Sequence, residues 1–165
     1  MDTLDVHETE QPLKIGGWLI VVAIGVVLSP MRSLMLMSTT YPDIFMDGTW
    51  EALTVVGNPA YSPMWAPLIL GEMLINVVFF CLGLYLAYLF FTKKVTLPRW
   101  YFGLALSSSL FILIDAYVIS IVIPDTAMFD SETQKEFFRS LVSLFIWSPY
   151  LFYSQRAKDT FIQAK

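Results

Sequence analysis

The chain has 165 residues, of which 56% are hydrophobic and 15% are charged, and its formal net charge is −4. An average soluble domain contains roughly 25% charged residues, so this composition excludes a water-soluble fold and predicts an integral membrane protein. There is no basic stripe of the kind that binds nucleic acid. The single cysteine, Cys81, excludes an intrachain disulfide and a thiolate metal site.

The N-terminal segment, residues 1–14, is predicted to be a disordered cytoplasmic tail. It is polar and rich in acidic residues, and it lacks the basic start and small-residue cleavage site of a secretory signal. Residues 15–153 are predicted to form one membrane domain. Residues 154–165 are expected to be a second cytoplasmic tail.

Apolar runs divide the membrane domain into helices long enough to cross a hydrocarbon layer of about 30 Å. The predicted spans are about 15–37, 65–92, 100–123 and 137–153. The fourth is the shortest, but Ser131 and Gln134 have the spacing of a capping box, so this helix is expected to begin one or two turns outside the bilayer. The sequence therefore predicts an all-α integral membrane bundle of four transmembrane helices.

Basic residues predict the orientation of the bundle, because cytoplasmic loops carry an excess of lysine and arginine. They gather in the link between the second and third spans and after the fourth span, whereas residues 38–64 contain none. The residues concerned are Lys93, Lys94, Arg99, Arg156, Lys158 and Lys165. We therefore expect both termini in the cytoplasm and residues 38–64 and 124–136 outside.

The first outer loop has the pattern of a short helix. Asp43, Asp47 and Glu51 recur every four residues, while Trp50 and Leu53 occupy another face. This spacing predicts an amphipathic helix over residues 44–56 that lies on the outer membrane surface.

Ionisable residues within spans are costly and mark candidate sites. Helical rise places Arg32, Glu72, Asp115 and Arg139 in the outer third of the membrane, and Asn76 lies one turn from Glu72 on the same face. Two positive and two negative charges at one depth can neutralise each other. We expect Arg32 to pair with Glu72, and Asp115 with Arg139.

Two interpretations of this polar cluster remain open, namely the packing core of a four-helix bundle and a site for a ligand or an ion. No cofactor and no metal are expected, because the only histidine, His7, lies in the acidic tail and no phosphate-binding glycine loop occurs. Ser107, Ser108 and Ser109 lack a nearby base, so hydrogen bonding between helices is the expected use of these hydroxyls.

A pair of motifs at the two ends of the membrane domain indicates a family. Gly16, Gly17 and Trp18 begin the first span, and Trp147, Pro149 and Tyr150 lie in the fourth. With these motifs the chain resembles an uncharacterised, YdgK-like bacterial family of small four-span inner-membrane proteins, classified as a domain of unknown function. The resemblance implies a bacterial inner membrane and the four-span plan, and it implies no activity.

The function expected from the sequence is non-enzymatic, namely binding or stabilising a partner protein or membrane lipids. The alternative is a small transporter or channel component that uses the outer polar cluster. An enzyme acting on lipids is a third possibility, since Glu72 could serve as an acid or a base, but no accompanying site is visible.

Overall fold

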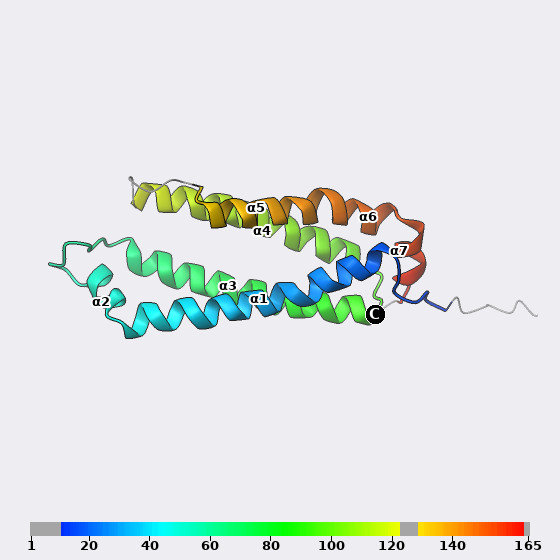
Figure 1. Cartoon of the computed structure of the whole chain (residues 1–165), viewed down its shortest axis with the longest axis horizontal. Coiled ribbons are helices and arrows are strands. Elements are labelled where there is room, and N and C mark those ends of the chain that lie inside the picture. The colour runs from blue at the N-terminus through cyan, green and yellow to red at the C-terminus, as the bar shows by residue number, and fades with distance from the viewer. Residues whose placement is uncertain (1–10, 123–128, 164–165) are drawn as a thin grey trace, which may run out of the picture.

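The protein is a helical bundle, seen in a computed structural model that describes residues 11–122 and 129–163 (Figure 1). Three helices are long and apolar enough to cross a membrane: α1 (Trp18–Met46), α3 (Trp65–Phe91) and α4 (Leu97–Val122). The described part of the chain contains no named strand. The all-helical class is therefore confirmed, and the three apolar helices indicate a multi-pass membrane protein.

A fourth rod is built from three consecutive segments, α5 (Ser131–Val142), the π-helical turn η1 (Ser143–Trp147) and α6 (Ser148–Tyr153). Figure 1 shows them as one line beside α4. Pro149 has no N–H to offer the carbonyl of Phe145, and the wider turn ends just before it, with the N–H of Ser148 bonded to the carbonyl of Ser143. The π-helical turn thus lets one rod continue through a proline.

Helix α1 is longer than the predicted span over residues 15–37. It continues to Met46 with Pro30 and Pro42 inside it, so the amphipathic helix predicted over residues 44–56 is partly wrong. Only α2 (Thr49–Thr54) forms a separate helix there. Its Trp50 ring packs on Phe45 of α1 at 5.1 Å between centroids, and Trp50 and Leu53 are partly buried while Glu51 is exposed.

The start of α5 also differs from the sequence prediction. Asp130, rather than Ser131, is the N-cap residue, because its carboxylate accepts a hydrogen bond of 2.7 Å from the backbone N–H of Thr133. This bond lowers the pKa of Asp130 below its ordinary value, since it stabilises the ionised form. The cap is therefore present at neutral pH and is lost only as the pH falls through that lowered pKa.

Helices pack in two pairs, α1 with α3 and α4 with the α5–α6 rod, and α3 and α4 join the pairs. Small residues mark the closest approaches. A side-chain carbon added at Gly83 of α3 would lie 3.5 Å from the ring of Pro30 on α1. Ser109 of α4 and Ser140 of α5 are buried and share a hydrogen bond of 3.0 Å. This bond is the interhelical use expected for Ser109.

The apolar core lies at the end of the bundle that holds the α3–α4 link. It includes Leu19 and Val22 of α1, Phe90 of α3 and Leu151 of α6. Over the rest of the spans the apolar side chains point outward, since only 22% of the most apolar windows of α1 and α3 is buried. An apolar surface of this kind is suited to lipid and unsuited to water.

Backbone contacts tie this same end together. The α3–α4 link and the C-terminal segment form a bridge between Lys94 and Gln163, and the N–H of Leu13 bonds to the carbonyl of Asp159. The helix α7 (Gln155–Thr160) packs its Ala157 and Thr160 into the interior. The segment 154–165, expected as a tail, thus contributes a folded helix over much of its length.

Replacing Gly83 should separate α1 from α3. Gly83→Leu is expected to cost about 1–3 kcal/mol of unfolding free energy, because the larger side chain would overlap Pro30. Gly83→Ala should be tolerated, since its Cβ makes an ordinary contact. The free energy would be measured by reversible unfolding in lipid bicelles.

The matched control is Gly71→Leu in the same helix, where a Cβ would have no neighbour within 4 Å. Equal losses for Gly83→Leu and Gly71→Leu would contradict close packing at Gly83.

Candidate functional site

Four polar side chains from three helices meet in the half of the bundle opposite the apolar core. Asn76 and Glu72 lie one turn apart on α3, Tyr41 comes from α1 and Asp115 from α4. The Asn76 amide donates a hydrogen bond of 2.8 Å to the Tyr41 hydroxyl and lies close to the Glu72 carboxylate. We call Tyr41, Glu72, Asn76 and Asp115 the polar cluster.

The polar cluster brings two acidic side chains, those of Glu72 and Asp115, near each other. The carboxylates of Glu72 and Asp115 are close enough to interact, and both are half-buried. Within residues 11–122 and 129–163, neither forms an ion pair with lysine or arginine. Carboxylates at this depth are costly when uncompensated, so the arrangement favours a proton, a cation or a hydrogen-bond donor beside them.

A small cavity adjoins the polar cluster. It has a volume of about 20 Å³ and is lined by Leu36, Met37, Thr40, Tyr41, Glu72 and Asn76. A space of this size holds one water molecule, which needs two to four polar partners. The side chains of Tyr41, Glu72 and Asn76 can supply them.

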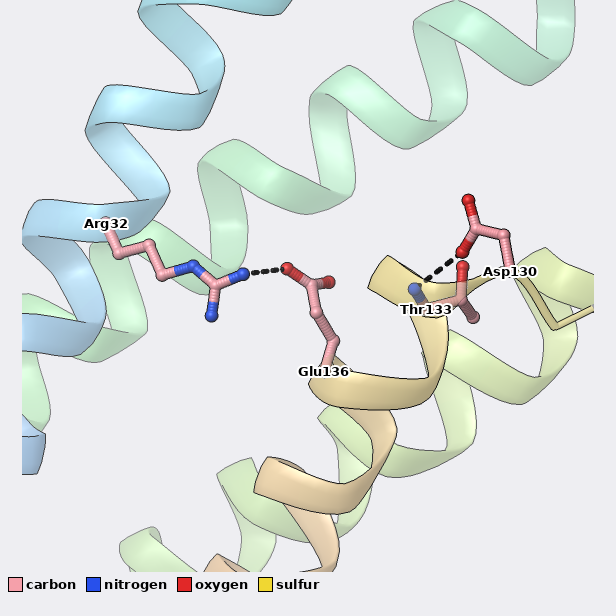
Figure 2. A network of polar contacts seen from close by, with 4 residues as sticks. All are labelled: Arg32, Asp130, Thr133 and Glu136. Carbon is pink, nitrogen blue, oxygen red and sulfur yellow. Dashed lines mark hydrogen bonds and ion pairs between the residues drawn. The ribbon is translucent and has the colours of Figure 1, made fainter.

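The expected pair of Arg32 with Glu72 is wrong. Arg32 instead pairs with Glu136 of α5, with 2.6 Å between Nη2 and Oε1. Figure 2 shows the guanidinium reaching from α1 toward the carboxylate. The two side chains are 48% and 39% exposed, so Arg32 lies on an outer face and bridges to the fourth rod.

The expected pair of Asp115 with Arg139 is also wrong. Arg139 is exposed on α5 and forms no ion pair with Asp115 in the part of the chain that the structure describes. Neighbouring residues on a helix point in different directions. Ser140, the next residue, faces α4 and is buried against Ser109, so Arg139 points to an exposed side of α5. Of the predicted cluster, Glu72, Asn76 and Asp115 come together, and the two arginines lie elsewhere.

Sequence reasoning missed Tyr41 and Glu136, since both were placed in outer loops. Tyr41 lies inside α1 because the helix continues through Pro42. Tyr41 could have been predicted to continue the helix, because it follows Met37 by four residues and so lies on the same helical face. Glu136 lies on the second turn of α5, and its signal was the helical start near Ser131.

The family-like motifs meet at the other end of the bundle. The rings of Trp18 and Trp147 are 6.3 Å apart, and Tyr150 packs edge-on against Trp147. The Arg156 side chain lies on Gly16 and Gly17, so closely at Gly16 that an added Cβ would overlap its guanidinium. Gly17 has a φ of +58°, which L side chains rarely adopt. Apart from Pro149, which is exposed at the start of α6, these residues form packing contacts between the N-terminal and C-terminal parts of the chain.

The described residues include no group of three or more His, Cys, Asp or Glu side chains that could hold a metal ion. The polar cluster offers the carboxylates of Glu72 and Asp115, the amide of Asn76 and the hydroxyl of Tyr41. This set of groups can exchange a proton or accept hydrogen bonds.

These features define a helical multi-pass membrane protein with a polar cluster inside its apolar part. The sequence model of the family described as "Protein of unknown function (DUF2569)" matches residues 12–162. The chain belongs to this family, which agrees with the resemblance to an uncharacterised family. No curated protein and no solved structure matches the chain significantly.

Arg32 and Glu136 are expected to stabilise the protein as a pair. Each single change, Arg32→Gln or Glu136→Gln, should cost roughly 1–3 kcal/mol, because the pair is half exposed and lies between the surface and buried cases. The double variant should lose less than the sum of the two single losses. A double-mutant cycle of unfolding free energies in bicelles measures this coupling.

The control is Glu132→Gln, an exposed residue on the same helix. Strict additivity of Arg32→Gln and Glu136→Gln, or an equal coupling between Arg32 and Glu132, would contradict the ion pair.

Proposed function

We propose that the chain spans a bacterial inner membrane four times, with both termini in the cytoplasm. The fourth span would be the rod Ser131–Tyr153, which at 1.5 Å per residue is about 35 Å long. Its exposed Phe138, Phe145 and Ile146 favour contact with lipid. The lysines and arginines of the α3–α4 link support a cytoplasmic placement of that end.

We propose further that the protein is non-enzymatic and binds a partner protein or a lipid at the polar cluster. The observation that carries this proposal is the meeting of Glu72 and Asp115, from two apolar helices, without a basic partner in the described residues. Retaining two uncompensated carboxylates in apolar surroundings lowers stability, which favours a binding role over a packing role. A donor group on a partner helix or a lipid headgroup would compensate them.

A small transporter or channel component is the second candidate. The cavity beside Glu72, Asn76 and Tyr41 favours it, because the space admits one water and adjoins a carboxylate that can carry a proton. On this alternative the cluster would be a step in a path for protons or small cations. Flux into proteoliposomes would then depend on Glu72.

Photo-crosslinking from the polar cluster tests the binding proposal. A photoreactive amino acid at Met37, which lines the cavity, should give one discrete protein or lipid adduct in native membranes. Neutralising the cluster with Glu72→Gln and Asp115→Asn should reduce that adduct about tenfold, because the charge-assisted contacts are lost. Mass spectrometry of the purified adducts measures the change.

The matched control is Asp43→Asn with Glu51→Gln, which removes two exposed carboxylates outside the cluster. Adducts of equal yield in the neutralised, control and unaltered proteins would contradict binding at the cluster. Loss of proton or cation flux in the neutralised protein, with no adduct in any variant, would favour the transporter.

A further inference from the structure

A groove lies between α3 and α4, near the link that joins them. Its volume is about 300 Å³, at the lower end of the range of roughly 300–1,000 Å³ typical of ligand sites. The main lining residues are Leu82, Tyr85, Leu86, Arg99, Trp100 and Leu104. The groove is mostly apolar and is separate from the polar cluster, which lies in the other half of the bundle.

Helical spacing explains how the groove runs. Leu82, Tyr85 and Leu86 follow one face of α3, and Trp100 and Leu104 lie one turn apart on α4. The rings of Tyr85 and Trp100 meet edge to face, with centroids 5.1 Å apart. Tyr85 and Trp100 are 41% and 45% exposed, so the groove opens on the outward apolar side of the bundle. This side faces lipid if α3 and α4 cross the membrane.

Gly103 keeps part of the groove empty. A Cβ added at Gly103 would have no neighbour within 4 Å. Gly103 follows Arg99 by one helical turn, so the open space begins directly beside the arginine and continues toward Ser107. From Arg99 to Ser107 the helix rises about 12 Å. The groove therefore offers a narrow apolar path with a cation at one end.

Among the residues that line the groove, Arg99 carries the charge. Arg99 is exposed and forms no ion pair with another described residue. No Asp or Glu occurs in the sequence between Glu72 and Asp115, although Lys93 and Lys94 fall in that interval. Arg99 is the third residue of α4, which places it at the level where an apolar helix leaves the hydrocarbon.

We propose that this groove binds one anionic phospholipid. The Arg99 guanidinium binds the headgroup phosphate, and one acyl chain lies along Leu86, Gly103 and Leu104. A guanidinium suits phosphate because it donates two parallel hydrogen bonds. Among the described residues, no carboxylate lines the groove to satisfy the ammonium of a zwitterionic headgroup, so an anionic lipid is preferred. The inference does not depend on the function proposed for the polar cluster.

Native mass spectrometry of the purified protein tests the proposal. Phosphatidylglycerol and phosphatidylcholine with identical acyl chains would be titrated separately. We expect one phosphatidylglycerol molecule to bind about tenfold more tightly than phosphatidylcholine, because of the charge-assisted contact with Arg99. Arg99→Gln should remove this preference, and Gly103→Leu should weaken the binding of both lipids by filling the groove.

Controls separate the groove from general attraction to a basic surface. Lys158→Gln removes an exposed cation elsewhere, and Gly25→Leu adds the same bulk at an exposed glycine of α1. Both should leave the lipid preference unchanged. If Gly103→Leu fails to fold, Ser107→Leu places similar bulk further along the groove.

Three results would overturn the proposal. The first is equal affinity for the two lipids. The second is an equal loss of preference in Arg99→Gln and Lys158→Gln, which would assign the effect to surface charge. The third is complete competition by inorganic phosphate, which would make a free anion, rather than a lipid, the ligand of Arg99.

Discussion

Charged and polar side chains in the apolar part of this bundle have to be satisfied by the protein, because hydrocarbon offers neither water nor counter-ions. Arg32 meets this constraint by reaching Glu136 on the fourth rod. Ser109 and Ser140 meet it by bonding to each other across α4 and α5. In the described residues, the amide of Asn76 and the hydroxyl of Tyr41 lie near the carboxylates of Glu72 and Asp115, and no lysine or arginine pairs with either carboxylate.

The two ends of the bundle are built differently. At the end with the α3–α4 link, the ring contact of Trp18 with Trp147, the bridge of Lys94 with Gln163 and the Arg156 side chain on Gly16 hold the chain together. Toward the other end, the hydrogen bond of Asn76 with Tyr41 and the ion pair of Arg32 with Glu136 join helices.

The lengths of the apolar runs predicted the long helices well, because a segment that crosses hydrocarbon has few secondary structures available to it other than a helix. Helix α3, at Trp65–Phe91, nearly reproduces the predicted range. The end of α1 was not predicted, because the apolar run ends near Met37 whereas the backbone stays helical through Pro42 to Met46. The partners of the charged side chains were harder to predict than the helices. Arg32 and Glu136 are 104 residues apart, and their contact depends on how each helix is rotated, which periodicity alone does not determine.

The central claim is that Glu72 and Asp115 form an uncompensated pair of carboxylates kept for binding. The unfolding free energy of Glu72→Gln, measured by steric trapping in bicelles without added ligand, tests this claim most directly. Because no arginine pairs with Glu72, we predict a free energy equal to or above that of the unaltered protein. A loss of about 3–5 kcal/mol, the cost of breaking a buried ion pair, would show that Glu72 is part of a structural clamp and would contradict the account.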